Sequence, residues 1–220
     1  MTGYRAKGHY QNGRIVEGYE EKRFSGLSGW LRIRFEGRAV RKALGGAGRG
    51  LRILDMPCGT GRFAHLLLEG GNQVVHADIS LEMIQYARKR INLPAESLGF
   101  VRCDAEALPF RDGAFDCVLC FRFLPHLPPE LREKVLRELS RVSGGALVLD
   151  YRYRYAFRSL SLWIRHRLGL AKPLHPRLSL SQISSELERA DLSLVRWIPV
   201  VWLFSEKVVL MCRRQSRTRG

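Results

Sequence analysis

The stretch Leu51–Leu68, LRILDMPCGTGRFAHLLL, decides how we expect the chain to fold. Its first part, Leu51–Asp55, is an apolar strand that ends on a carboxylate, and a turn with Gly59 and Gly61 follows it. Apolar residues at helical spacing come next and predict a helix. Glycines let a backbone pass close to a ligand, and a helix N-terminus offers N–H groups to an anion. The stretch therefore predicts a nucleotide-type cofactor above the carboxyl end of a parallel sheet.

Predicted strands and helices alternate along the chain up to residue 151. This alternation predicts an α/β fold, with a parallel sheet and right-handed crossovers. After residue 151 the pattern changes to a basic amphipathic helix, a further helix and two closing strands. The predicted strands are Leu51–Asp55, Gln73–Ile79, Leu98–Cys103, Phe115–Phe121, Ala146–Tyr151, Leu192–Val201 and Lys207–Arg213, and the predicted helices include Trp30–Leu44, Leu81–Ile91, 128–141, Tyr155–Leu168 and Ser181–Ala190.

The positive charge of the 220-residue chain is concentrated at its two ends. The formal net charge is +16: residues 1–50 have 11 Lys and Arg against 4 Asp and Glu, residues 51–150 have 12 against 13, and residues 151–220 have 14 against 4. Basic flanks favour anionic partners such as nucleic acid, an anionic membrane surface or a phosphorylated substrate, although a generally Arg-rich proteome would give the same balance.

The five cysteines and the N-terminal sequence bear on where the protein works. Four of the cysteines lie in predicted strands and are typical of small buried side chains in a reducing compartment. Cys117 and Cys120 form a C-x-x-C pattern, but side chains three apart on a strand point to opposite faces, so we expect no metal site. No signal peptide and no apolar run of membrane-spanning length is visible. The sequence thus predicts a soluble, cytoplasmic protein, with peripheral contact at a membrane surface as a further hypothesis.

Acidic residues stand at three successive predicted strand ends: Asp55, Asp78 and Asp104. In a parallel sheet these carboxylates lie along one edge, beside the glycine turn. A dinucleotide is the competing interpretation, because residues 59–64 fit G-x-G-x-x-A and Asp78 could bind a ribose. Three features argue against a dinucleotide. Asp55 puts a negative charge where a pyrophosphate would approach, and Asp104 adds an acid suited to an adenine amino group. The chain also closes with two strands rather than with a second mononucleotide-binding half.

Four motifs make the chain resemble the class I S-adenosylmethionine (SAM)-dependent methyltransferases: LDMPCGTGRF, VVHADIS, FVRCDAEALPF and FDCVLCFRFLPHL. The resemblance covers residues 51–151 and implies a Rossmann-like, seven-stranded sheet, mostly parallel, in the order 3-2-1-4-5-7-6, with helices on both faces and SAM as the cofactor. Pro57 stands where this family usually has glycine, so we expect no backbone N–H contact there.

The same resemblance implies a role for each residue of these motifs. Asp78 would bind the ribose hydroxyls, and Asp55 would order the turn and the cofactor's ammonium group. The turn itself would hold the amino-acid part of the cofactor, and Phe121 would lie on its methionine side. The implied cofactor-binding residues are Asp55, Cys58, Gly59, Thr60, Gly61, Asp78, Ile79, Met83, Asp104, Ala105 and Phe121, with Ile79 and Met83 against adenine and Asp104 and Ala105 at its edge.

Acceptor chemistry points to other residues. His126, just after the fourth strand, is the candidate general base if the acceptor must lose a proton. Tyr19 is a second candidate catalytic residue, and Arg23 and Arg122 are candidate substrate-binding residues. Cys58 lies in the cofactor turn and is therefore not predicted to be a nucleophile. The absence of N-P-P-Y or D-P-P-Y after the fourth strand weakens amino-group transfer to DNA bases or glutamine.

We expect one methyltransferase domain over residues 1–220, with an N-terminal arm and helix (1–44), a SAM-binding core (51–151), a substrate or lid insert (152–191), a closing hairpin (192–213) and a basic tail (214–220). A weaker resemblance, in YEEKRFSGLSGW, DMPCGTGR and FRFLPHLP, is to bacterial methyltransferases associated with lipopolysaccharide-kinase-like proteins. The leading hypothesis is methyl transfer to oxygen or carbon of a small or lipid-linked acceptor. The alternatives are an RNA methyltransferase and a non-catalytic SAM-binding or nucleic-acid-binding module.

Overall fold

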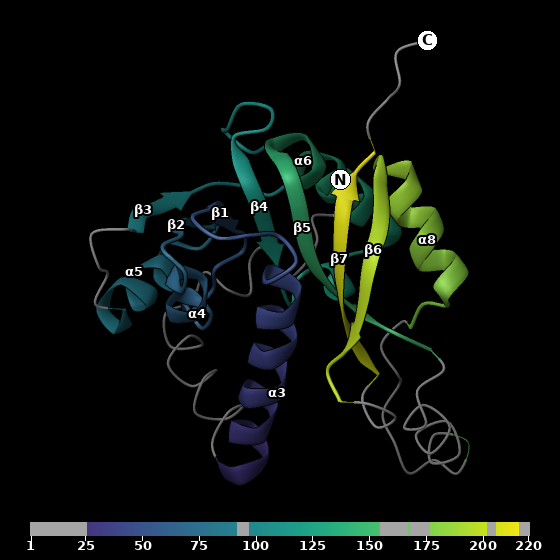
Figure 1. Ribbon diagram of the computed structural model, residues 1–220, viewed down its shortest axis with the longest axis horizontal. Helices are drawn as coiled ribbons and strands as arrows, with labels where there is room; N and C mark the ends of the chain where they lie inside the picture. The colour runs from purple at the N-terminus through teal and green to yellow at the C-terminus, as the bar shows by residue number, and fades with distance from the viewer. Residues whose placement is uncertain (1–25, 92–96, 155–166, 168–176, 202–205, 216–220) are drawn as a thin grey trace.

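The computed structural model describes residues 26–91, 97–154, 167, 177–201 and 206–215. Within them the chain forms one seven-stranded sheet with the order β3-β2-β1-β4-β5-β7-β6 (Figure 1). The pairs among β1 to β5 are parallel, whereas β7 is antiparallel to both β5 and β6. The predicted strand order is confirmed. The strands are β1 (Arg52–Asp55), β2 (Gln73–Asp78), β3 (Ser97–Arg102), β4 (Phe115–Cys120), β5 (Ser143–Arg152), β6 (Leu192–Pro199) and β7 (Lys207–Arg214).

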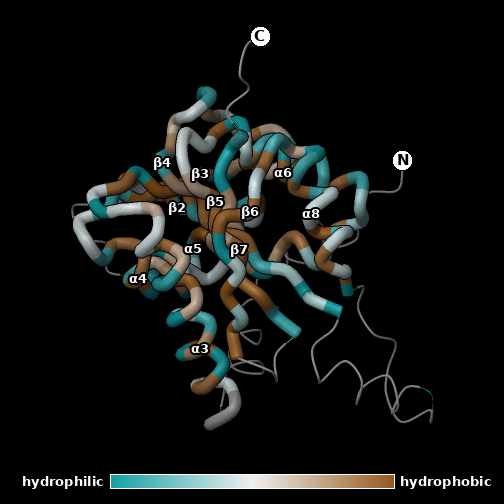
Figure 2. Tube along the Cα trace, turned by 45° about the vertical axis from the view of Figure 1, so that its right-hand side comes forward, coloured by the Kyte–Doolittle hydropathy of each residue, from teal (hydrophilic) through white to brown (hydrophobic). Residues whose placement is uncertain are grey.

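Helices cover both faces of this sheet. One face packs against α3 (Gly26–Leu44) and α4 (Ala64–Leu68), and the other packs against α6 (Pro129–Val142) and α8 (Leu180–Arg189). Between β2 and β3 runs α5 (Leu81–Arg90), which packs against α4. Apolar residues run along the central strands and hydrophilic residues along the outer sides of the helices (Figure 2), so the core is the two layers between sheet and helices.

Alternation along the strands decides which side chain enters which layer. In β4, Cys117 packs in the layer under α3 and α4, whereas Cys120 packs in the layer under α6 and α8. The prediction that these two side chains point to opposite faces is confirmed. Burial raises the pKa of the Cys117 thiol to about 12, which is typical of an unreactive core cysteine.

Several predicted boundaries differ from the structure, the largest difference being the first helix, which begins at Gly26 rather than Trp30. Two further differences have a local reason. The helix after the glycine turn begins only at Ala64 and has five residues, because residues 59–63 still belong to the turn. The fifth strand begins at Ser143 rather than Ala146, because Ser143 already pairs with Phe115 of β4. The predicted helix Tyr155–Leu168, most of the insert and the basic tail beyond residue 215 lie outside the described residues.

Candidate functional site

The turn after β1 folds back onto β2 at the carboxyl edge of the sheet. The backbone N–H of Cys58 donates to the Ala77 carbonyl oxygen at 2.8 Å, and that of Gly59 donates to Asp78 Oδ2 at 2.9 Å. Gly59 and Gly61 adopt the left-handed conformation, with φ of +52° and +72°. The Met56–Pro57 peptide bond at the entry to the turn is cis. The turn is therefore positioned by backbone contacts to the neighbouring strand.

The two glycines of this turn serve different purposes. A Cβ on Gly59 would meet no atom of the described residues within 4 Å, so the backbone there borders open space within this part of the chain. A Cβ on Gly61 would lie 2.1 Å from Cδ1 of Ile91, so the backbone there packs directly on the end of α5. Gly61 thus lets the turn approach α5, and Gly59 leaves room for a ligand to approach the backbone.

Asp78 lies at the end of β2 and is 6% exposed. Its two carboxylate oxygens accept hydrogen bonds from the N–H groups of Gly59 and Ser80, each at 2.9 Å. Burial raises the pKa of the Asp78 carboxyl, and these N–H bonds oppose the rise. Ser80 in turn caps α5 by accepting a hydrogen bond from Met83 N–H at 3.1 Å, so Asp78, Ile79 and Met83 occupy one strand-to-helix turn.

Asp55 is buried at the end of β1, opposite His76 of β2. Its Oδ2 lies 3.1 Å from His76 Nδ1, and His76 has no exposed surface. Burial raises the pKa of the Asp55 carboxyl, and the contact with His76 opposes the rise. His76 was not among the predicted site residues. It lies on the same buried strand as Asp78, but only the register between β1 and β2 shows that it stands beside Asp55.

Asp104 and Ala105 follow β3 in a tight local turn. The Asp104 side chain accepts a hydrogen bond from Glu106 N–H at 3.0 Å, and its carbonyl accepts one from Ala107 N–H at 3.1 Å. The Asp78 carbonyl accepts a hydrogen bond from Cys103 N–H at 3.1 Å, which joins this turn to the end of β2. Burial raises the pKa of the Cys103 thiol to about 11, with further contributions from Asp78 and Asp104. The second and third acidic residues therefore lie near the same thiol on one edge of the sheet.

Phe121 and Arg122 form the turn that follows β4. The Phe121 ring is buried and meets Phe63 edge-to-face, with ring centroids 4.9 Å apart. Arg122 has a φ of +60°, and its N–H donates to Asp150 Oδ1 of β5 at 2.6 Å. Asp150 was not among the predicted site residues; it lies inside β5, two residues before the strand ends, and no sequence pattern singles it out.

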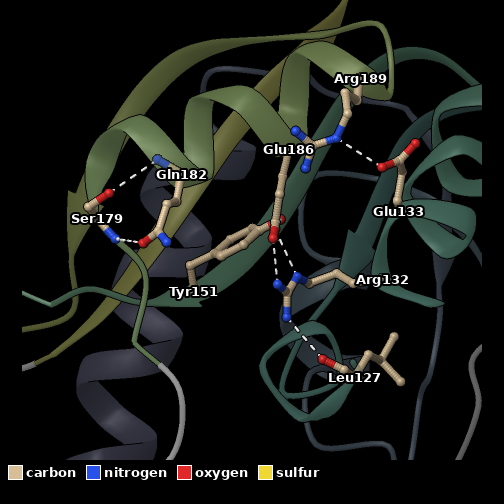
Figure 3. A network of polar contacts seen from close by, with 8 residues as sticks. All are labelled: Leu127, Arg132, Glu133, Tyr151, Ser179, Gln182, Glu186 and Arg189. Atoms are coloured by element: carbon tan, nitrogen blue, oxygen red, sulfur yellow. Dashed lines mark hydrogen bonds and ion pairs between the residues drawn. The ribbon is translucent and has the colours of Figure 1, made fainter. Parts of the chain in front are cut away.

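His126 ends a short 3-10 helix, η1 (Leu124–His126), and is partly exposed. The residue after it is held by a buried network that is drawn in Figure 3. Arg132 donates to the Leu127 carbonyl oxygen at 2.9 Å and forms a two-fold ion pair with Glu186 of α8, and Tyr151 donates to Glu186 Oε2 at 3.3 Å. This network ties α6, α8 and β5 together under the sheet face that is opposite to α3.

Comparisons with known proteins address this arrangement directly. Residues 53–144 match the family model described as "Methyltransferase domain". By this match, residues 53–144 belong to a methyltransferase domain. The predicted methyltransferase family is confirmed for this domain.

Relatives of the methyltransferase domain include two quinone-pathway enzymes. The chain is 42% identical over 122 residues to a demethylmenaquinone methyltransferase of Thermus thermophilus, an overlap that covers 53% of each protein. It is 33% identical over 131 residues to the ubiquinone/menaquinone biosynthesis C-methyltransferase UbiE of Pectobacterium carotovorum, which covers 56% of this chain and 48% of that protein. The chain thus spans about half the length of the curated relatives it matches.

Among solved structures, the magnesium protoporphyrin IX methyltransferase of Synechocystis with bound S-adenosylhomocysteine (SAH) has a TM-score of 0.73. It is 20% identical, and the overlap covers 95% of this chain and 99% of that one. A SAM-dependent methyltransferase from Thermotoga maritima has a TM-score of 0.64 at the same identity and covers 95% of this chain and 100% of that one. At these identities the likeness shows a shared fold.

The structure places most of the predicted site residues along one edge of the methyltransferase domain. The ends of β1, β2 and β3 carry the three acidic residues, and the turn after β4 carries Phe121 and Arg122. Tyr19 and Arg23 lie outside the described residues. In the described part of the chain, no group of three or more His, Cys, Asp or Glu side chains could hold a metal ion. None of the described helices combines the length and the apolar character that crossing a membrane requires.

Proposed function

We propose that the protein transfers the methyl group of SAM to oxygen or carbon of a small-molecule or lipid-linked acceptor. The observation that carries this proposal is the open backbone at Gly59 beside the buried Asp78, at the carboxyl edge of a methyltransferase domain. An ionised carboxylate offers about four lone-pair sites, so the Asp78 side chain can accept hydrogen bonds beyond those from the backbone N–H groups of Gly59, Ser80 and Ile79. The two hydroxyl groups of a ribose would donate hydrogen bonds to such sites on the carboxylate.

The residues present fit the cofactor part by part. Asp78 would accept hydrogen bonds from the ribose hydroxyls, Ile79 and Met83 would contact adenine, and Asp104 and Ala105 would border the adenine edge. The turn of Cys58, Gly59, Thr60 and Gly61 would hold the amino-acid part, with Asp55 near its ammonium group and Phe121 on the methionine side. Burial and the nearby Asp55 and Asp78 raise the pKa of the Cys58 thiol, so this cysteine stays protonated and is a wall of the site rather than a nucleophile.

Bound SAM supplies a methyl sulfonium that is already reactive, so the chain has chiefly to position the acceptor and exclude water. His126 would take a proton from an acceptor hydroxyl. The next residue, Leu127, is fixed in place because its carbonyl oxygen accepts a hydrogen bond from Arg132. Arg122 would bind an anionic group of the acceptor, and Tyr19 and Arg23 of the arm would close the site. The quinone-pathway relatives support an aromatic, lipid-linked acceptor, and the basic flanks support peripheral contact with an anionic membrane.

Cofactor binding tests the proposal most directly. Isothermal titration calorimetry with SAH should show binding to the wild type and at least a tenfold weaker affinity for Asp78→Asn, which removes the charge but keeps the shape. Asp116→Asn is the matched control, because Asp116 also accepts a backbone N–H bond, from Arg52 at 2.8 Å, but at the amino end of β4. Its affinity should equal that of the wild type. Folded wild type without measurable SAH affinity refutes the proposed function.

The acceptor class needs a second experiment. Transfer of a tritiated methyl group from SAM to fractionated lysate, split into lipid, RNA, protein and small-molecule pools, should label the lipid or small-molecule pool. Label confined to the RNA pool would instead support the RNA methyltransferase alternative, which the basic flanks also favour.

A further inference from the structure

A buried cluster of charges lies beside the candidate site, on the sheet face that packs against α3. We call Glu36, Arg62, Asp150 and Lys207 the Glu36 cluster. They come from α3, the turn after β1, β5 and β7, and 171 positions of sequence separate Glu36 from Lys207. The Glu36 side chain is 2% exposed. Charges taken this far out of water are costly unless each has a partner.

Glu36 is the centre of this cluster. One carboxylate oxygen accepts a hydrogen bond from Lys207 Nζ at 2.8 Å, and the other accepts one from the Arg62 guanidinium. Lys207 Nζ also lies 3.6 Å from Asp150 Oδ2. Burial raises the pKa of the Glu36 carboxyl, but Lys207, Arg62 and Arg122 lower it to about 2, so Glu36 is ionised at neutral pH.

The two cations that Glu36 binds each lie over an aromatic ring. Lys207 Nζ is 5.1 Å from the centroid of the Phe121 ring, and the Arg62 guanidinium carbon is 5.0 Å from that of Phe63. The two rings meet edge-to-face at 4.9 Å. Glu36, the two cations and the two rings thus form a closed chain of contacts. A change in the Glu36 charge would act on both rings at once.

This closed chain joins the two backbone turns that border the candidate cofactor site. Arg62 and Phe63 follow Gly61 in the turn after β1, and Phe121 directly follows β4. Asp150, the fourth member of the cluster, accepts the N–H of Arg122 in the turn after β4. Within the described part of the chain, Glu36 forms no hydrogen bond or ion pair with a predicted cofactor-binding residue. Its two partners, Arg62 and Lys207, nevertheless each contact one of the two rings.

We propose that Glu36 is a positioning residue of the methyl-transfer site: by holding Arg62 and Lys207 it fixes the Phe63–Phe121 pair at the methionine end of the cofactor. The inference rests on the proposed function, because the methionine end has meaning only if SAM binds at this edge. It extends that function to α3, which lies outside the matched family region at residues 53–144.

The test compares two ligands that differ only at the methionine end. SAH has the whole cofactor skeleton, whereas adenosine lacks the homocysteine part, so the ratio of their affinities isolates the region that Phe121 and Phe63 border. Calorimetry at a temperature where each variant is fully folded should show an SAH-to-adenosine affinity ratio at least tenfold lower for Glu36→Gln than for the wild type. Adenosine affinity itself should stay within twofold.

Glu186→Gln is the matched control, because it also removes the charge of a buried glutamate paired with arginine, but on the opposite face of the sheet. It should lose stability as Glu36→Gln does and keep the wild-type affinity ratio.

Lys207→Met is the second variant, since it removes the cation over Phe121 and retains the Glu36–Arg62 pair. It should lower the affinity ratio about threefold to fivefold. This variant carries the test if Glu36→Gln does not fold.

The outcomes separate the two claims. Wild type that binds no SAH overturns the proposed function and the inference with it. Wild type that binds SAH, with an affinity ratio within twofold of wild type in both Glu36→Gln and Lys207→Met, leaves the proposed function standing and overturns the positioning role. A ratio that falls equally in Glu186→Gln also overturns it, because the effect would then follow from lost stability alone.

Discussion

Replacing Gly61 by alanine should destabilise the protein through one identifiable contact. Gly61 has a φ of +72°, and a left-handed conformation costs a residue with a Cβ about 1–2 kcal/mol. The new Cβ would also lie 2.1 Å from Cδ1 and 3.1 Å from Cγ1 of Ile91, and forcing a methyl group into a packed core costs about 1–3 kcal/mol. The expected loss is therefore about 3 kcal/mol, or about 6–12 °C in Tm for a chain of this size.

Two further variants make this prediction specific, with unfolding measured by urea titration and thermal circular dichroism. The new Cβ in Gly59→Ala meets no atom within 4 Å among the residues that the structure describes, so this variant should lose only the conformational cost of about 1–2 kcal/mol. Ile91→Val removes the methyl group that the new Cβ would strike. Alone it should cost about 0.5–1.5 kcal/mol, but combined with Gly61→Ala it should remove the part of the loss that comes from the Cδ1 clash and leave the conformational cost. Equal losses for the two glycine variants, together with additive effects of Gly61→Ala and Ile91→Val, would refute the reasoning.

Two other expectations concern buried charges. The Glu36 carboxyl has a pKa of about 2 in the folded protein and 4.5 as its ordinary value, so its ionisation contributes about 3 kcal/mol at neutral pH. Because the pKa in the folded protein is the lower one, this contribution is complete above about pH 4.5 and is lost as the pH falls toward 2. The difference in unfolding free energy between wild type and Glu36→Gln should therefore shrink over that pH range. A difference that does not vary with pH contradicts the assignment. Arg132→Met leaves Glu186 buried without its cation and should cost about 3–5 kcal/mol by urea unfolding. Arg132→Met combined with Glu186→Leu should recover most of that loss, and a double variant as unstable as the single one would show that packing, rather than the unpaired charge, is at fault.

Much of the fold could be predicted because the signals are local. β4 has apolar residues at nearly every position, as a strand buried on both faces requires, and α5 begins at the Ser80 cap and ends in Arg88, Lys89 and Arg90. The order of such elements leaves few topologies, since parallel crossovers are right-handed. Boundaries were less certain where the backbone passes from a turn to a helix without a capping side chain, as at Phe63 before α4.

The candidate site was only partly visible in the sequence. Asp78 and the glycine turn could be identified because their signals lie within one strand and the turn beside it. An acidic residue marks the strand end, and glycines mark the positions with positive φ. His76 and Asp150 could not, because a buried polar residue inside a strand has no distinctive pattern until its neighbour across the sheet is known. Their partners depend on strand register, which the chain sets only when the sheet forms.

The sequence by itself thus determined the parallel sheet, its antiparallel closing hairpin, and an edge that presents a glycine turn and three carboxylates. Only the tertiary structure decided which buried charges meet: Asp55 with His76, Arg132 with Glu186, and Glu36 with Arg62 and Lys207. Periodicity and turn chemistry act over a few residues, whereas these pairs join positions 21 to 171 residues apart. Such contacts form because helices and strands are packed together, and a charge left alone in that packing would be too costly to keep.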